Sequence, residues 1–311
     1  MRSNLRVDQA EGLRRLLVRN HTKVVIVASG KSGEARIEIT LNLAAALARL
    51  GKEVLVLDEM HSANGSVGNH GFTAKCDLLD VVQGKCKPSE AVLINQGFPV
   101  LSIARAMHSL AQLSQVEQLN LENALADVSY GMEVILVNAA MPVLNQVKGL
   151  SGHTDVSLCA ANGVSLMVMV DATTSGITDS YALIKRLALE NARLQFEIVV
   201  NKAVDEQAAM MVFGNMEKLA RRNLAARLEY LGFIPQDDKL ARATRLGKPV
   251  VEAFPASAAA KAYMELMKKL LSLPIQQSEM DGGVRAILQN LMKQISQPLQ
   301  QHGKKMAQVV N

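Results

Sequence analysis

The sequence predicts an α/β fold built on a doubly wound, mostly parallel sheet. Two observations support this prediction. Residues 24–58 read as a buried strand, a loop, a helix and a second buried strand. Further along the chain, short apolar runs alternate with helical patterns, which is typical of a parallel sheet covered by helices. With 311 residues and 49% hydrophobic content, the chain is long enough for one large core.

The first unit, 24–58, has the layout of a nucleotide-binding βαβ element. Its first strand, 24–27, is Val-Val-Ile-Val, which suits a strand buried on both faces. A helical pattern follows and stops at Gly51, and a second apolar strand ends at the carboxylate of Asp58. Small residues at 29–33 lie where a phosphate loop would lie. The apolar face of the helix comprises Ile37, Leu41, Ala44, Ala45 and Ala48.

The remaining elements divide the chain into three parts. Strands are predicted at 100–103, 164–170, 196–200 and 228–234, and helices at 115–127, 175–190, 207–226 and 256–271. We therefore expect an N-terminal helix at 1–20, an α/β domain at 21–273, and a linker with a tail helix at 274–311. The apolar face of the amphipathic tail helix consists of Val284, Ile287, Leu288, Leu291, Met292 and Ile295.

The loop after the first strand has lost residues that phosphate binding requires. Such a loop needs glycines, a lysine for the β- and γ-phosphates, and a hydroxyl for Mg²⁺. The stretch 31–37 resembles the deviant Walker A loop of the MinD/ParA ATPases, Lys-Gly-Gly-x-Gly-Lys-Thr, which implies a MinD-like P-loop NTPase fold. Lys31 and Gly33 match that pattern, whereas Arg36 replaces the second lysine and Ile37 the hydroxyl residue. Lys31, Gly33 and Arg36 remain as vestigial cofactor-binding candidates.

Two further sites of the resembled family are also altered. The aspartate that positions the hydrolytic water is replaced by Met60, and the neighbouring Glu59 is expected to point the other way. The aspartate that supports Mg²⁺ after an apolar strand is replaced by Asn138. Asn201 lies where the family places a base-reading asparagine, but with the phosphate site altered we favour a strand-end turn residue, and a vestigial cofactor-binding role is the alternative. We expect no catalytic residue, no metal site and no cofactor, unless the degenerate site still binds ATP and Mg²⁺.

The binding free energy lost through these replacements is comparable with the total free energy of nucleotide binding. Micromolar binding corresponds to roughly 8 kcal/mol. Each lost hydrogen bond to a charged group removes about 1.5–3 kcal/mol of this. Glu34, a like charge on the loop, adds roughly 1–4 kcal/mol of repulsion. The sequence therefore predicts a pseudo-ATPase.

The N-terminal segment carries a motif of its own. Residues 8–14 resemble the DQAxxLR motif of the FlhG regulators (also called FleN or YlxH), which belong to the MinD/ParA family and control flagellar number and placement. In that family the motif stimulates the GTPase FlhF. Further collinear similarity at 77–93, 178–185, 231–235 and 249–255 extends the resemblance over residues 8–272. The alternative is an amphipathic helix without a partner. The partner-binding candidates are Asp8, Gln9, Ala10, Leu13 and Arg14.

The tail helix and the signature Lys31 leave alternatives open. Family members have a C-terminal helix that lies on the inner membrane when the ATP-bound dimer forms. Here the polar face is mostly glutamine, with Arg285 and Lys293 as its basic residues, which favours docking on the body or on a protein partner.

The signature lysine of the family reaches the other subunit's nucleotide. Lys31 would then serve a heterodimer with an intact FlhG-type protein, or it is simply a solvated loop residue.

Composition limits the other functional classes. A net charge of +5 permits contact with polyanions, but aromatics are only 3%, so base stacking on nucleic acid is not expected. The three cysteines lack metal-ligand spacing and are expected to be reduced. No signal peptide or membrane span is predicted, so we expect a cytoplasmic protein, with peripheral contact to the inner membrane or cell pole left open.

The function predicted from the sequence is regulation of flagellar assembly, number or placement through protein–protein contacts. Expected partners are an FlhF-like GTPase and flagellar basal-body or regulatory proteins. The alternatives are an active MinD/ParA-like ATPase with a non-standard site and a DNA-associated ParA-like partitioning protein. Salt-dependent DNA binding would distinguish the last of these.

Overall fold

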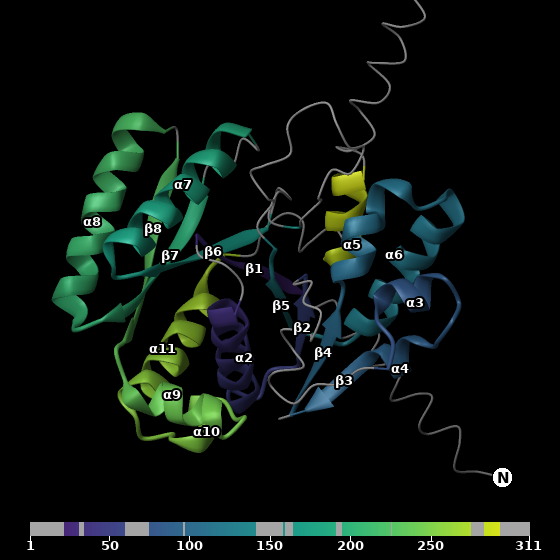
Figure 1. Cartoon of the computed structure of the whole chain (residues 1–311), viewed down its shortest axis with the longest axis horizontal. Coiled ribbons are helices and arrows are strands. Elements are labelled where there is room, and N and C mark those ends of the chain that lie inside the picture. The colour runs from purple at the N-terminus through teal and green to yellow at the C-terminus, as the bar shows by residue number, and fades with distance from the viewer. Residues whose placement is uncertain are drawn as a thin grey trace, which may run out of the picture.

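The computed structural model describes residues 22–30, 34–59, 75–95, 97–140, 158, 164–190, 195–224, 226–274 and 283–292. These residues build an eight-stranded sheet in the order β3-β4-β2-β5-β1-β6-β7-β8 (Figure 1). All neighbouring strands are parallel except β3 and β4, so the predicted doubly wound, mostly parallel sheet is confirmed. The strands are β1 (Lys23–Ser29), β2 (Val54–Asp58), β3 (Val92–Asn95), β4 (Phe98–Ser102), β5 (Val134–Asn138), β6 (Ser165–Asp171), β7 (Gln195–Ala203) and β8 (Arg227–Pro235).

Helices cover both faces of the sheet. One face packs against α2 (Glu34–Arg49), α9 (Asp238–Arg245), α10 (Val250–Ala253) and α11 (Ala258–Ser272). The other packs against α3 (Leu78–Val82), α4 (Pro88–Ala91), α5 (Ala104–Ser109), the short 3₁₀ turn η2 (Leu110–Gln112), α6 (Gln115–Ser129), α7 (Thr174–Glu190) and α8 (Glu206–Asn223). Strand β1 shows why both layers are needed, because Val24 and Ile26 face one layer while Val25 and Val27 face the other.

One helix boundary and one strand differ from the prediction. The helix predicted to reach residue 226 ends at Asn223, since Leu224 takes up extended backbone while its N–H still bonds to the Ala220 carbonyl. The edge strand β3 is antiparallel and was not predicted. It returns on β4 through a turn at Gly97, whose φ of +85° is a conformation that glycine adopts without strain.

The described part of the tail helix, 284–292, packs on the body beside α5 and α6, where Figure 1 shows it in yellow. Its apolar side chains Val284, Ile287, Leu288 and Leu291 are buried in the core, and Met292 packs against that core. On its polar side, Arg285 Nε and Gln289 Nε2 donate to Glu122 Oε2 of α6 at 3.3 and 2.8 Å. Of the three locations that the sequence leaves open, namely the inner membrane, the body and a protein partner, this segment lies on the body in the structure.

A buried lysine joins the two ends of the α/β domain. Lys23 begins β1 and is only 7% exposed. Its Nζ donates to the carbonyl oxygens of Leu270 (3.2 Å) and Leu273 (2.8 Å) at the end of α11. A positive charge is favourable there because the last carbonyls of a helix lack partners within the helix.

Candidate functional site

The polar groups of interest gather at the carboxyl edge of the parallel strands. Ligands of open α/β sheets bind at this edge, where neighbouring strands connect in opposite directions. Here β1 is the central strand, with β5 on one side and β6 on the other. Their carboxyl ends, together with those of β2 and β7, bring Ser29, Asp58, Asn138, Asp171 and Asn201 to one edge.

Two residues of the degenerate loop lie at the start of α2, and neither is placed to hold a metal ion. Ile37 is 1% exposed and belongs to the apolar core between α2 and the sheet. Arg36 is 2% exposed, and its Nη1 donates to the Ser29 carbonyl at 3.5 Å, turning the guanidinium back onto the end of β1. At position 37, which the resemblance aligns with the Mg²⁺-binding hydroxyl, the chain has a hydrocarbon side chain packed into its core.

The carboxylate after β2 is bound by the amide after β5. Asp58 and Asn138 are partners in register on adjacent strands, and they are 1% and 0% exposed. Asn138 Nδ2 donates to Asp58 Oδ1 at 2.7 Å. Asn138 Oδ1 has no hydrogen-bond partner among the described residues. An aspartate at 138 would put two carboxylates in contact and favour a cation between them, whereas the amide satisfies the carboxylate directly.

Glu59 has a structural role that the sequence did not indicate. It is 3% exposed, and both of its carboxylate oxygens accept backbone hydrogen bonds. Oε2 accepts from Ala140 N–H at 2.9 Å and Oε1 from Leu158 N–H at 2.7 Å. Glu59 therefore ties the chain after β5 to the end of β2. These two contacts fix the orientation of the Glu59 carboxylate.

A second set of polar side chains, Asp171, Asn201 and Lys202, forms contacts with one another near the carboxyl ends of β6 and β7. Asn201 Nδ2 donates to Asp171 Oδ1 at 2.8 Å, and Lys202 Nζ forms an ion pair with Asp171 Oδ2 at 2.9 Å. Lys202 has a φ of +59°, which is uncommon for a residue with a side chain. Asn201 lies within β7 and is 5% exposed, so it is a buried strand residue and the favoured prediction of a strand-end turn residue is wrong. The role of Asp171 was missed, although a carboxylate ending an apolar strand is a signal for it.

Glycine is required where the loop leaves β1. A Cβ at Gly30 would lie 2.2 Å from the Asp179 carbonyl carbon and 2.3 Å from the Ser180 nitrogen of α7. Backbone atoms cannot yield at such distances as a flexible side chain could. Helix α7 therefore packs closely against the start of the loop and limits the space at the carboxyl end of β1.

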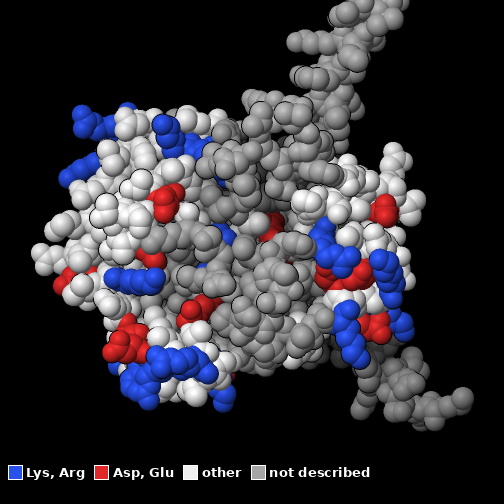
Figure 2. Space-filling model, viewed as in Figure 1, with Lys and Arg blue, Asp and Glu red and all other residues white. Residues whose placement is uncertain are grey.

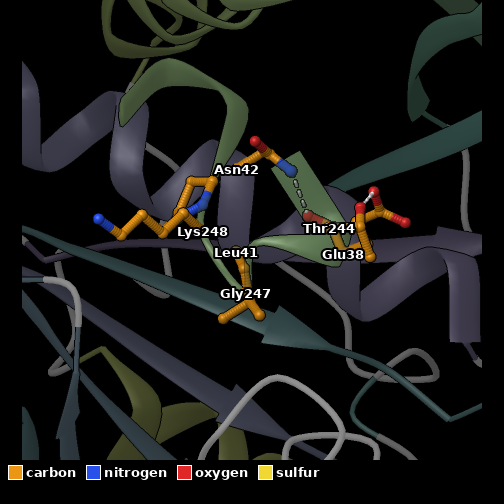
Figure 3. A pocket seen from close by; sticks show the side chains of 7 residues that line it. Glu38, Leu41, Asn42, Thr244, Gly247 and Lys248 are labelled. Carbon is orange, nitrogen blue, oxygen red and sulfur yellow. Dashed lines mark hydrogen bonds between the residues drawn. The ribbon is translucent and has the colours of Figure 1, made fainter. Parts of the chain in front are cut away.

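The segment 244–250, which overlaps the region of collinear similarity at 249–255, is hydrogen-bonded to α2 (Figure 3). Thr244 Oγ1 donates to Glu38 Oε1, and Asn42 Oδ1 accepts from Val250 N–H at 2.6 Å. The cavity between these elements has a volume of about 10 Å³. That is room for roughly one water molecule and not for a nucleobase.

A larger cavity, about 510 Å³, lies beside edge strand β8 and α11. Its lining carries both signs of charge, with Asp205, Glu206 and Glu265 facing the same space as Lys261 and Lys269. Neither an anion nor a cation is favoured by that mixture. The size is in the range of ligand pockets, but the polar groups at the ends of β2 and β5 do not line it.

Several predicted site residues lie outside the described part of the chain. These are Lys31, Gly33, Met60 and Ile295, with the N-terminal set Asp8, Gln9, Ala10, Leu13 and Arg14. Within the described part, no three histidine, cysteine or carboxylate side chains are grouped to hold a metal ion. In the same part, none of the helices has the length and apolarity needed to cross a bilayer.

Charge on the face shown in Figure 2 is mixed. Lysine and arginine side chains lie beside aspartate and glutamate side chains at the lower left and on the right of the view, while the blue groups at the upper left edge have no red neighbour. Nucleic-acid binding depends on many cations along one track of phosphates. This face gives no support to the DNA-associated alternative, despite the net charge of +5.

Comparisons with known proteins identify the family and agree with the fold. Residues 25–250 match the family model described as the CobQ/CobB/MinD/ParA nucleotide binding domain. The antiactivator FleN of Pseudomonas aeruginosa is 33% identical over 255 residues, covering 81% of this chain and 88% of FleN. The flagellum site-determining protein YlxH of Helicobacter pylori is 27% identical over 230 residues, covering 73% of this chain and 74% of YlxH.

Solved structures share the fold at lower sequence identity. The MinD cell division protein of Aquifex aeolicus superimposes with a TM-score of 0.56 at 20% identity, covering 82% of this chain and all of that one. The septum site-determining protein MinD of Pyrococcus horikoshii, complexed with Mg-ADP, gives a TM-score of 0.55 at 20% identity and covers 81% and 96%. At these identities the likeness establishes the fold alone.

Proposed function

Because the chain belongs to the CobQ/CobB/MinD/ParA nucleotide-binding family, we propose that it is a flagellar regulator of the FleN and YlxH type that works through protein contacts and has lost Mg²⁺-assisted ATP hydrolysis. The names of its relatives support the flagellar role. The loss of hydrolysis is supported chiefly by one contact, the buried hydrogen bond from Asn138 to Asp58.

The group that the family implies, Mg²⁺-ATP, does not fit the described residues. A magnesium ion takes oxygen ligands in near-octahedral geometry, from carboxylates, hydroxyls and water. In this chain Asp58 is bound by an amide, the hydroxyl position is the core residue Ile37, and Glu59 holds two backbone N–H groups. To bind the ion, the protein would have to break contacts in a site from which water is excluded. Each such hydrogen bond to a charged group contributes about 1.5–3 kcal/mol.

A regulator without hydrolysis must act by binding, and two segments are the candidate contact sites. The first is the N-terminal helix with Asp8, Gln9 and Arg14, which we propose engages an FlhF-like GTPase. A glutamine is suited to orienting an attacking water, and an arginine to stabilising transferred phosphoryl charge. The second is the signature Lys31, which we propose completes the nucleotide site of an intact FlhG-type partner. Flagellar basal-body and regulatory proteins are the further partners expected for this class.

Calorimetric titration with ATP and Mg²⁺, combined with a phosphate-release assay, tests the loss of hydrolysis. We expect no binding in the micromolar range and no release above a no-protein control. Release that exceeds the control and is abolished by Lys31→Ala or Arg36→Ala would overturn this and establish the active-ATPase alternative. A triple variant, Ile37→Thr with Met60→Asp and Asn138→Asp, checks whether these positions account for the loss.

Two further assays test the partner role. A peptide of residues 1–20 is expected to raise the GTP turnover of an FlhF-like GTPase, and Gln9→Ala should remove the effect. ATP-dependent co-purification with an intact FlhG-type protein should weaken in Lys31→Ala.

In cells, deleting the gene should change the number or position of flagella seen by electron microscopy. An unchanged flagellar pattern would reject the flagellar role whatever the result with ATP.

A further inference from the structure

The cavity of about 510 Å³ beside β8 lies at one edge of the sheet, and the candidate site does not use it. We call it the β8 cavity. Helix α11 forms one wall, and the link at 204–206 between β7 and α8 forms the other. Between these walls α11 packs closely on β8 (Figure 1), because a Cβ at Gly232 would lie 2.8 Å from Leu266 Cδ2. Glycine at this position therefore allows the close approach on which the shape of the cavity depends.

The inner lining of the β8 cavity is apolar. Ala258, Ala262 and Leu266 recur every four residues, so they follow one side of α11. Phe233 of β8 lines the same space. On the opposite wall Val204 is 80% exposed. The surface therefore has an apolar recess and, beside it, an apolar side chain that projects into solvent.

The rim of the β8 cavity carries both signs of charge. Lys261, Glu265 and Lys269 also recur every four residues on α11, so their charges alternate along one side of the helix. Asp205 and Glu206 add two carboxylates on the opposite wall. Within the described part of the chain, neither Lys261 nor Lys269 has an ion-pair partner. The rim therefore offers unpaired cations and carboxylates on one patch of surface.

We propose that the β8 cavity is the contact surface between two copies of this chain related by a two-fold axis. Such a contact uses the same patch on both copies, so that residue i of one copy meets residue j of the other, and j meets i. A patch can be complementary to itself only if it carries both signs of charge, as this rim does. A nucleic acid, or a protein surface with one sign of charge, would be repelled by part of the rim.

The spacing on α11 indicates which charges meet. When two α11 helices cross antiparallel, midway between positions 261 and 265, Lys261 of each copy faces Glu265 of the other, and two ion pairs form at once. Within one copy Glu265 already pairs with Lys268 at 2.7 Å. Both of those side chains are more than half exposed, and such pairs contribute little, so Glu265 can exchange this partner for another.

This contact is separate from any contact through the candidate site. The polar groups at the ends of β2 and β5 do not line the β8 cavity. The proposed pairing therefore requires no nucleotide and no metal ion, and it is independent of the proposed flagellar role.

Sedimentation velocity of the full chain, without nucleotide or Mg²⁺ and over a range of micromolar concentrations, tests the proposal. We expect a species of twice the mass of one chain. Lys261→Glu and Glu265→Lys should each raise the dissociation constant of this dimer about tenfold, because like charges then meet twice. Lys218→Glu reverses an exposed charge on α8 that does not line the cavity, so this matched control should leave the constant unchanged.

Mixing the two single variants distinguishes a two-fold contact from other effects of the substitutions. In a mixed dimer, the carboxylate introduced by Lys261→Glu meets the ammonium introduced by Glu265→Lys. The native Glu265 of the first variant meets the native Lys261 of the second. Both contacts are attractive, so the mixture should dimerise as tightly as wild type although each variant alone does not. The double variant, with both reversals in every chain, should also dimerise like wild type.

Three results would overturn the proposal. The first is a wild-type chain that stays monomeric at every concentration, and the second is a dimer that neither charge reversal weakens. The third is a mixture that fails to dimerise although circular dichroism shows both variants to be folded. Val204→Asp adds a test of the apolar contact, since a side chain that is 80% exposed is not needed for the fold. It should weaken the dimer about tenfold, and an unchanged dissociation constant would place the contact outside the β8 cavity and so reject the proposal.

Discussion

Asn138 and Asp58 end two adjacent parallel strands, and the amide of one donates to the carboxylate of the other at 2.7 Å in a region closed to solvent. The pair satisfies the carboxylate without a metal ion. Asn138→Asp reverses this arrangement by putting two carboxylates in contact. At an effective dielectric constant of about 20 their repulsion is roughly 4 kcal/mol, so the variant should be much less stable than wild type near neutral pH.

The pH dependence of Asn138→Asp follows from the sign of that interaction. Like charge and burial raise the pKa of one carboxyl in the folded state above its unfolded value. A carboxyl pKa that is higher in the folded state than in the unfolded state lowers the free energy of unfolding at pH values above the pKa of the unfolded state. This loss of stability disappears as the pH falls below the pKa of the unfolded state. Urea unfolding of the variant and of wild type should therefore converge in acid. Asn201→Asp is the control, since Lys202 already neutralises Asp171 there and the loss should be smaller.

Glu133 should contribute stability that acid removes. Burial raises the pKa of its carboxyl, but the Lys52 ammonium and the Glu53 N–H outweigh this, and the pKa lies below the ordinary 4.5. A carboxyl pKa that is lower in the folded state stabilises the fold at pH values above the pKa of the unfolded state. This contribution is lost as the pH falls through the pKa of the folded state. Glu133→Gln should lower stability at neutral pH by no more than about 1 kcal/mol, because both partners are about a third exposed. Thermal unfolding should show the two proteins converging below pH 4.5.

Replacing Gly30 tests the contact between α7 and the loop. Gly30→Ala puts a methyl group against the backbone of Asp179 and Ser180, and overpacking of this kind costs typically 1–3 kcal/mol. Gly214→Ala in α8 is the matched control, because nothing lies within 4 Å of its Cβ position. That change should stabilise the helix by up to about 1 kcal/mol. Equal effects of the two substitutions on denaturant unfolding would contradict the close approach.

Glu122 should hold the described part of the tail helix on the body. Glu122→Gln removes the charge that accepts from Arg285 and Gln289, which should weaken docking by about 1 kcal/mol and increase amide exchange roughly fivefold in 284–292. Hydrogen–deuterium exchange measures this directly. Glu265→Gln, which breaks an exposed pair with Lys268, should leave the same amides unchanged. Exchange that does not respond to Glu122 would mean that apolar packing alone fixes the helix.

Local pattern was sufficient to predict most of the sheet. The β-branched run at 24–27 and the later apolar runs correspond to β1, β4, β6, β7 and β8, because a strand buried on both faces needs such residues whatever surrounds it. Strand β3 was missed because its pairing depends on a return at Gly97. The end of α8 was misplaced because nothing in the residues around 223 forces a helix to stop there.

For the candidate site, the sequence alone could predict only which residues differ from the pattern of the MinD/ParA ATPases. The sequence indicates that Ile37 and Asn138 cannot support Mg²⁺, and the structure places them in the core and against Asp58. It did not indicate the partners of Glu59 or Asp171. Those contacts join segments separated by 81, 99 and 30 residues, and periodicity carries no information on which distant backbone group a carboxylate will meet.

The contact between Lys23 and the end of α11 affects how the chain folds as it leaves the ribosome. Lys23 emerges 250 residues before Leu273, its most distant carbonyl partner, and Thr22 beside it emerges 110 residues before Met132. At about 5–20 residues per second, the wait for Leu273 lasts roughly ten seconds to one minute. Strand β1 has neither neighbour until β5 (residues 134–138) has been made, it lacks β6 until residues 165–171 follow, and the contacts of Lys23 are completed only when α11 ends. Nascent chains halted before residue 134 should therefore recruit holding chaperones through 23–29, while chains extended past the exit tunnel by α11, in which Lys23 has all its partners, should release them.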